Sequence, residues 1–375
     1  MTQRSITRDI NVTALSLALC LLALAWSSAA ISAFDSFDDE DKPAEQVYKN
    51  IKVLNGLPAS ELDGTMYYMS ASLGVGCTHC HTNPWDSDVK PAKLAARRMI
   101  QMTRDINKEN FSGNPVVNCY TCHRGQTQTV TVPPAEQPAW QMLDVRPADA
   151  KPPVAMPATE QLIEKYIRAI GGEAAIAKLK TRVSRGTETT TNRMTPPAST
   201  PLEVYQTAAN KSLRVTYHPQ GAVYRGFNGT TAWVKDARGQ REIKGKELAE
   251  EKRDADFFRY LKIKESYPGM RVLGKEKVGD REAYVVGATS RDGSREKLYF
   301  DADTGLIIRR HVTFRTALGP IPEVIDFTDY KDVDGIKLPF IISWSRPPFT
   351  STQKLVEIKI NVPIDDSKFE MPAAK

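Results

Sequence analysis

The spacing of apolar residues changes along this 375-residue chain. Between residues 43 and 107, apolar side chains recur every three or four positions, which is the spacing of one face of a helix. After residue 172 they mostly alternate with polar side chains, as in strands with one buried face. The pattern therefore predicts a helical first part and a strand-rich second part.

The first part is expected to contain three helices. The first covers residues 43–55, and Val47, Ile51 and Leu54 share one of its faces. The second covers residues 60–73 and is followed by Gly74, a residue that commonly ends helices. The third begins near Pro91 and continues to about residue 107, with an apolar side of its own.

The second part follows a change of composition. Residues 126–157 are rich in proline, which is typical of a linker, and we place the domain boundary there. A helix is expected from Thr159 to about Ile170, and another over roughly residues 245–261. Between and after them, short alternating segments are separated by turn signals, which predict hairpins of an antiparallel sheet. These signals are Asn228-Gly229, Gly279-Asp280, Asp303-Thr304-Gly305 and Asp334-Gly335.

The first 33 residues have the order of a secretory signal peptide: a basic start, an apolar middle over 12–26, and small residues up to Ala30 and Ala33. An uncleaved anchor is the alternative, because residues 12–34 are long enough to cross a bilayer. Either reading predicts an exported, periplasmic protein, with the second adding attachment to the membrane. The net charge of +6 is diffuse, so no nucleic-acid partner is expected.

Two C-x-x-C-H motifs dominate the chemistry of the first part. Cys77, Cys80 and His81 form one, and Cys119, Cys122 and His123 form the other. The spacing is that of covalent haem attachment, in which both thiols join one porphyrin edge and the histidine binds the iron. A zinc ribbon is the alternative, but its cysteine pairs usually lie about 15–20 residues apart. The motifs therefore predict two covalently bound haem c groups with His81 and His123 as iron ligands.

The second ligand of each iron must come from elsewhere. His79 lies inside its own motif, while His218 and His311 lie in the strand-rich part, where they are expected at the surface or in turns. Methionine is the remaining donor, and it raises the reduction potential of a haem. Two helical pairs can supply it, although such pairs also occur as core filler, so at least one member of each pair is expected to pack. These pairs are Met66 with Met69 and Met99 with Met102.

The segment from about residue 49 to Gly125 resembles the cytochrome c subunit of photosynthetic reaction centres. The resemblance rests on the stretch from Met66 through His81, on residues 96–107, and on the second motif with Arg124 and Gly125. It implies that the first methionine of each pair, Met66 or Met99, binds the iron of the haem attached downstream. That family usually carries four haems, whereas this chain has two motifs, so its redox partner could equally be a reaction centre or a respiratory complex.

The strand-rich part is more weakly similar to periplasmic lipoprotein-carrier and sorting proteins, whose curved antiparallel sheets wrap around helices. The similar pieces are residues 166–172, 299–306 and 330–339. The resemblance implies that this part can hold an apolar ligand or serve as a docking module.

Together these observations predict a multidomain protein. A small all-α diheme c-type cytochrome domain, residues 34–125, is followed by the linker and by an α+β domain with a curved antiparallel sheet, residues 158–375. The predicted function is electron transfer through two haems with histidine and methionine ligands, without substrate chemistry. The alternatives are a peroxidase-like diheme enzyme with an open iron, and a carrier of apolar ligands or lipoproteins with a redox module.

Overall fold

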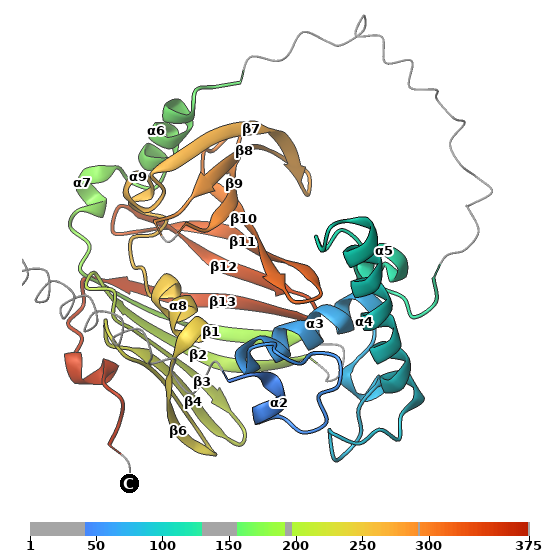
Figure 1. The fold of residues 1–375 in the computed structure, drawn as a ribbon. Coiled ribbons are helices and arrows are strands. Elements are labelled where there is room, and N and C mark those ends of the chain that lie inside the picture. The colour runs from blue at the N-terminus through green and yellow to red at the C-terminus, as the bar shows by residue number, and fades with distance from the viewer. Residues whose placement is uncertain (1–41, 130–155, 192–196, 292, 374–375) are drawn as a thin grey trace, which may run out of the picture.

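The computed structural model describes residues 42–129, 156–191, 197–291 and 293–373. The predicted leader, residues 1–33, lies outside these ranges, and so does the predicted linker apart from residues 126–129, 156 and 157. A helical part, residues 42–129, lies beside a large, strongly curved sheet (Figure 1). Within the ranges that the structure describes, no helix combines the length and apolar character needed to cross a membrane.

The helical part is built around one long and one medium helix. The predicted second helix is present, and Gly74 ends it in the left-handed conformation with φ of 67°. The predicted third helix begins at Pro91, as expected, and continues a little further than predicted. The elements are α2 (Ala44–Val47), η2 (Ala59–Glu61), α3 (Leu62–Leu73), η3 (Cys77–His79), α4 (Pro91–Asn110) and α5 (Cys119–His123).

The predicted helix over residues 43–55 is wrong beyond Val47. Tyr48 is extended, and Asn50 has a positive φ of 61°, so the chain leaves the helix after one turn. The Asn50 side chain donates hydrogen bonds to the Asp86 carbonyl at 2.5 Å and to the Asp88 carboxylate at 2.7 Å. Contacts with a distant loop therefore outweigh the helical spacing of Val47, Ile51 and Leu54.

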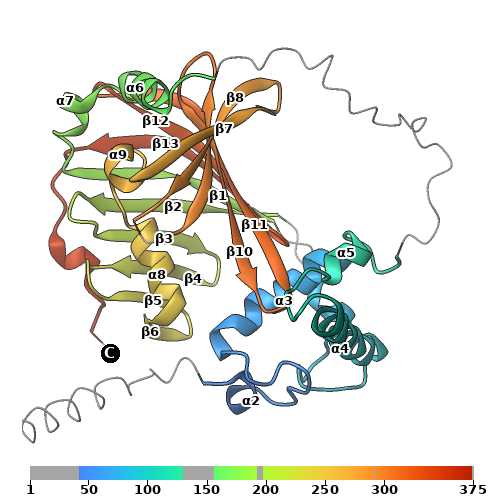
Figure 2. The same ribbon diagram turned by 45° about the horizontal axis from the view of Figure 1, so that its top comes forward.

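The second part is a single antiparallel sheet of 13 strands, which confirms the predicted curved antiparallel sheet (Figures 1 and 2). Its order is β6-β5-β4-β3-β2-β1-β13-β12-β11-β10-β9-β8-β7, so the first strand pairs with the last. The strands are β1 (Thr181–Thr191), β2 (Ala198–Thr207), β3 (Ser212–His218), β4 (Gly221–Phe227), β5 (Ala232–Asp236), β6 (Gly239–Ile243), β7 (Gly269–Val278), β8 (Arg281–Thr289), β9 (Arg295–Asp301), β10 (Ile307–Thr316), β11 (Gly319–Val333), β12 (Ile336–Arg346) and β13 (Phe349–Ile360).

Short helices accompany the sheet: α6 (Thr159–Ala169), α7 (Glu173–Ile176), α8 (Gly245–Asp254) and α9 (Ile263–Ser266). The apolar face of α6 packs in one core cluster with residues of β8–β13. The helix predicted over 245–261 ends at Asp254. Beyond it, Phe257 and Leu261 are buried in the same core, and the Phe257 N–H donates to the Asn210 side chain at 3.1 Å. Burial of these side chains on the sheet therefore outweighs continuation of the helix.

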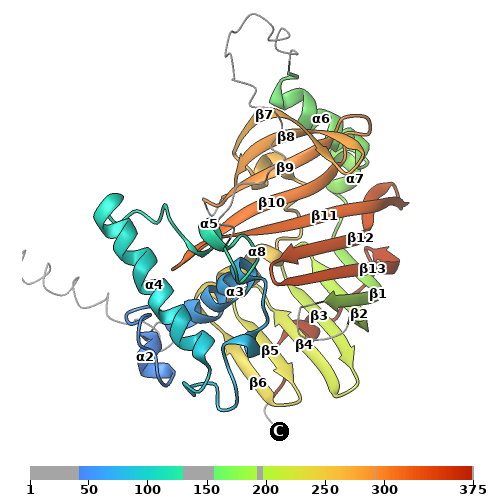
Figure 3. The same ribbon diagram turned by 90° about the vertical axis from the view of Figure 1, so that its right-hand side faces the viewer.

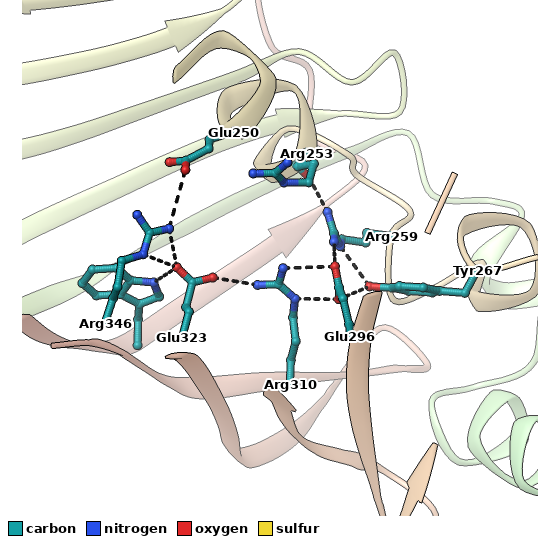
Figure 4. A network of polar contacts seen from close by, with 9 residues as sticks. Glu250, Arg253, Arg259, Tyr267, Glu296, Arg310, Glu323 and Arg346 are labelled. Atoms are coloured by element: carbon teal, nitrogen blue, oxygen red, sulfur yellow. Dashed lines mark hydrogen bonds and ion pairs between the residues drawn. The ribbon is translucent and has the colours of Figure 1, made fainter. Parts of the chain in front are cut away.

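A network of charged side chains crosses strands β9–β12 between the sheet and α8 (Figure 4). Arg310 donates to Glu296 at 2.7 Å and to Glu323 at 2.9 Å, and Arg259 also pairs with Glu296. The side chains of these four residues are at most 9% exposed. Because each charge has an oppositely charged partner, the network can remain in the interior without isolated ions.

Helix α3 joins the two parts of the molecule. It lies between α4 and the sheet (Figure 3) and contacts strands β10 and β11. One apolar cluster contains Tyr68 of α3, Ile100 of α4, and Leu318 and Ile321 near the β10–β11 turn. The helical part therefore shares a small core with the sheet.

Candidate functional site

A cavity of about 660 Å³ lies on one side of α3. Its size falls within the range of about 300–1,000 Å³ that is usual for ligand pockets. Met66 and Met69 line it from α3, and Cys77, Cys80 and His81 line it from the first motif. The structure thus brings the whole first motif and its methionine pair to one cavity. The remaining wall is largely apolar and includes Ile51, Val53, Leu54, Leu62, Leu73, Ile100 and Phe349.

Helix α3 has two distinct faces, one toward the cavity and one in a packed core. Leu62, Met66 and Met69 recur at helical spacing and face the cavity, which agrees with the predicted apolar stripe. Thr65, Tyr68 and Ser72 are buried elsewhere on the helix and do not line the cavity. The helix therefore presents sulfur to the cavity with one face while it packs with another.

Both motifs form a single helical turn. In the first, His81 N–H donates to the Cys77 carbonyl at 3.0 Å. In the second, α5 begins with a reciprocal pair of hydrogen bonds between Asn118 and Thr121. A turn of this kind places residues three and four positions apart on one side. Each motif can therefore direct two thiols and one imidazole the same way.

The two motif histidines have the same hydrogen bond. His81 Nδ1 lies 3.0 Å from the Trp85 carbonyl oxygen, and His123 Nδ1 lies 3.1 Å from that of Gln126. A carbonyl only accepts, so Nδ1 carries the proton in each bond and Nε2 keeps its lone pair. A metal-binding histidine is commonly held in this way by a carbonyl or carboxylate. The local backbone therefore prepares Nε2 of both residues to bind a metal.

Lys93 of α4 contacts the same carbonyl as His81. Its ammonium donates to the Trp85 carbonyl at 3.1 Å and to the Ser87 carbonyl at 2.9 Å, and it lies 3.5 Å from the Asp88 carboxylate. The side chain is only 12% exposed and lines the cavity. A fixed positive charge is therefore held behind the imidazole of the first motif.

A clamp of polar contacts holds the cavity's loops. Arg97 donates to the Asp88 carboxylate at 2.9 Å and to the Asn50 carbonyl at 3.0 Å. The hydrogen bond from Arg97, followed by that from Asn50, lowers the pKa of Asp88 to about 2. Asp88 is therefore ionised at neutral pH. Helix α4 thus fixes both the loop after α2 and the loop after the first motif.

The second motif is attached to α3 and α4 by its flanks. The Asn107 side chain donates to the Val117 carbonyl at 2.6 Å and accepts from the Val117 N–H at 2.9 Å. On the other flank, Gly125 N–H donates to the Ser72 carbonyl at 2.8 Å. The position of α5 is therefore fixed from both ends. Within α5, burial raises the pKa of the Cys119 thiol.

The methionines of the second pair differ from those of the first. Met99 and Met102 of α4 are 41% and 42% exposed and do not line the cavity of the first motif. Helix α4 does contact α5, which carries the second motif. The other three histidines lie away from the cavity lining: His79 is exposed, and His218 and His311 belong to β3 and β10.

None of the four motif cysteines forms a disulfide. Across the described residues, no three Cys, His, Asp or Glu side chains gather as a metal site. The two cysteine pairs therefore do not meet in the arrangement of a zinc ribbon, and Cys119 does not line the cavity of the first motif.

Sequence reasoning missed several residues of the cavity. Trp85 follows the first motif closely, and the charges of Lys93 and Arg97 near the start of α4 could have suggested a role. Phe349, which begins β13, carries no such signal because it lies far away in the sequence.

Residues 21–151 match the family described as photosynthetic reaction centre cytochrome C subunit. Cytochrome c-554 of Chloroflexus aurantiacus is 43% identical over 82 residues, which are 20% of this chain and 20% of that protein. The photosynthetic reaction center cytochrome c subunit of Rubrivivax gelatinosus is 36% identical over 92 residues, or 24% of this chain and 25% of that one. The chain thus spans about a quarter or less of these relatives.

Among solved structures, a DUF1329 family protein from Desulfovibrio piger covers 56% of this chain and 96% of its own, with 16% identity and a TM-score of 0.42. A LolA superfamily protein from Nitrosomonas europaea covers 58% of this chain and 99% of its own, with 13% identity and a TM-score of 0.41. The family match, over residues 21–151, includes both motifs. In its C-x-x-C-H segment, this chain resembles the cytochrome c subunit of photosynthetic reaction centres.

Proposed function

We propose that this protein is an exported electron carrier with two covalently bound haem c groups. The observation that carries the proposal is the cavity beside α3, where two thiols and an imidazole meet a pair of thioethers. This donor set fits one haem c, and the apolar lining suits the face of a porphyrin. Bound there, haem c would supply an iron that takes up and releases one electron at a time.

The residues of the chain have separate roles in this proposal. The thiols of Cys77 and Cys80 anchor the first haem, and those of Cys119 and Cys122 anchor the second. The Nε2 atoms of His81 and His123 are the near-side iron ligands, held in place by their Nδ1 hydrogen bonds. A ligand fixed in this way needs little rearrangement when the charge on the iron changes.

For the far-side ligands we propose Met66 and Met99. Met66 and Met69 both line the first cavity, so the cavity alone does not choose between them. The resemblance to the reaction-centre subunit selects the first methionine of each pair. The exposure of Met99 is compatible with a haem that covers it on α4. Two side chains would then hold each iron and leave no place for a substrate, which favours a carrier over a peroxidase-like enzyme.

The sheet offers less support for a carrier of apolar ligands. The core beside α6 is filled by the protein's own side chains, and paired charges occupy the space near α8. We therefore place the function in the helical part. Its redox partner is proposed to be a protein complex at the membrane, either a reaction centre or a respiratory complex, on the exported side.

Attachment can be tested by haem counting in paired variants. The native protein is expected to keep the mass of two haems after denaturation and to stain for haem peroxidase activity. Replacing Cys77 and Cys80 together with serine should remove one haem, and replacing Cys119 and Cys122 should remove the other. Haem that extracts into acidic organic solvent, or one haem in the native protein, would contradict the proposal.

A further inference from the structure

The sheet contributes one wall of the first cavity. Phe349, the first residue of β13, lines it together with the cysteines of the first motif. Its ring meets the Tyr67 ring of α3 edge to face, with centroids 4.9 Å apart and planes at 87°. This geometry is favourable for aromatic pairs. One residue of the cavity wall therefore comes from outside the helical part.

The same sheet also provides the surface against which α3 packs. Tyr68 is 3% exposed and packs in one cluster with Leu318 and Ile321 of the β10–β11 hairpin. Gly319 starts β11 directly against the Tyr68 ring, and a side-chain carbon at this position would overlap the Tyr68 hydroxyl. Its φ of 155° adds strain for any other residue. The close approach of α3 to the sheet thus depends on glycine.

Arg346 connects the two hairpins that reach α3. It pairs with Phe349 across the β12–β13 ladder, and its guanidinium lies 4.5 Å from the centre of the Phe314 ring on β10. It also donates to Glu323 at 2.6 Å, and Glu323 accepts from the buried Arg310. The cavity wall is therefore attached to the charged network between the sheet and α8 (Figure 4).

We infer that the sheet sets the environment of the first haem: Phe349 is a positioning residue that keeps water from the cavity, while the β10–β11 hairpin holds α3 against it. This inference rests on the proposed function. Water near the iron stabilises the more highly charged ferric state, so its exclusion raises the reduction potential. The sheet then acts as a redox-tuning wall, and a partner that displaced the β12–β13 hairpin would lower that potential.

The test compares Phe349→Ala with Val356→Ala in the full-length, haem-loaded protein. Val356 is on the same strand and is 80% exposed, so its replacement should leave both haems unchanged. Phe349→Ala should lower the midpoint potential of one haem only and speed the binding of added cyanide or imidazole to that haem. Unchanged potential and unchanged ligand binding in Phe349→Ala would overturn the inference.

Two further variants keep the test decisive. If Phe349→Ala does not fold, Phe349→Leu retains much of the volume and removes the aromatic edge, so a smaller shift in the same direction is expected. Gly319→Ala alters the surface against which α3 packs without touching a cavity residue, and it should also lower the potential of the first haem. Folded, haem-loaded variants with native potentials in both cases contradict the inference.

The failures of the two proposals are distinguishable. If Cys77 and Cys80 carry no haem in the native protein, the proposed function fails. If they carry haem and Phe349→Ala behaves like Val356→Ala, only the role of the sheet fails.

Discussion

At the scale of single residues, the sulfur donors are the most direct test of the proposed iron coordination. Replacing Met66 or Met99 with leucine keeps an apolar side chain of similar volume and removes the sulfur. Each change should convert one haem to high spin, remove its share of the sulfur-to-iron absorption band and lower its potential. Absorption spectra and redox titration measure these changes.

The second member of each pair is the matched control. Met69→Leu and Met102→Leu should leave the spectra nearly unchanged, because the resemblance assigns iron binding to the first member of each pair. Loss of the absorption band in Met69→Leu would identify Met69, one helical turn further along α3, as the ligand in place of Met66. If no methionine variant changes either haem, histidine–methionine coordination is wrong.

The position of Lys93 predicts a difference in reduction potential between the two proposed haems. Its ammonium shares the Trp85 carbonyl with His81, and this draws electron density away from the Nδ1 hydrogen bond. A positive charge at the cavity also disfavours ferric iron. Lys93→Met should therefore lower the potential of the first haem, as measured by redox titration, without changing its spin state.

Lys90→Met is the control for this prediction. Lys90 donates to the Thr78 carbonyl at 2.8 Å. The change therefore removes an equal charge but keeps the hydrogen bonds of His81 and Lys93 to the Trp85 carbonyl. A smaller shift is expected. Equal shifts in the two variants would mean that charge alone, and not the shared carbonyl, determines the effect.

At the scale of elements, the charged network predicts which substitutions in the sheet lower the free energy of unfolding most. Glu296 has a fully buried side chain between Arg259 and Arg310. Glu296→Gln leaves the buried guanidinium of Arg259 without a carboxylate partner and that of Arg310 with Glu323 alone, and should lower the free energy of unfolding by about 3–5 kcal/mol. Glu357→Gln on β13, whose carboxylate pairs at the exposed surface with Arg185, should change the free energy of unfolding little by comparison. Denaturant unfolding of the full chain checks both expectations.

The same carboxylate gives the network a pH dependence. Burial alone would raise the pKa of Glu296, but hydrogen bonds and charge from Arg310, with the charge of Arg259, outweigh burial and lower it. Its contribution to stability is therefore complete above the unfolded pKa of about 4.3 and is lost as the pH falls through the lower, folded value. The difference in stability between native protein and Glu296→Gln should shrink in that acidic range.

Local patterns predicted the elements where neighbours in sequence decide the structure. Gly74 ends α3 and Pro91 begins α4, as predicted. The predicted turn at Asp334-Gly335 is also present, and both of its residues have positive φ. The prediction of a first helix to residue 55 was wrong because the Asn50 side chain donates a hydrogen bond to Asp86, 36 residues away. No periodicity contains such a contact, so it could not be predicted from spacing.

At the scale of the whole molecule, the sequence predicted two kinds of structure but not their contact. The motif residues and Met66 could be identified because attachment chemistry fixes their spacing. Gly319 and Phe349 belong to ordinary strand patterns, and only the fold brings them to α3. A boundary drawn from composition therefore says little about independence: the predicted linker separates the parts in sequence, while Tyr68 joins them in one core.

The position of Phe349 also determines an order of assembly. The other walls of the first cavity come from residues 47–100, whereas Phe349 begins the last strand of the sheet. Chains are made from the amino end, and early segments fold first. The helical part can therefore form before the sheet supplies its wall, and until then the thiols of Cys77 and Cys80 stay open on that side. If the cavity holds haem as proposed, the final strand would cover the cofactor after its attachment, so this wall would protect the product without obstructing its formation.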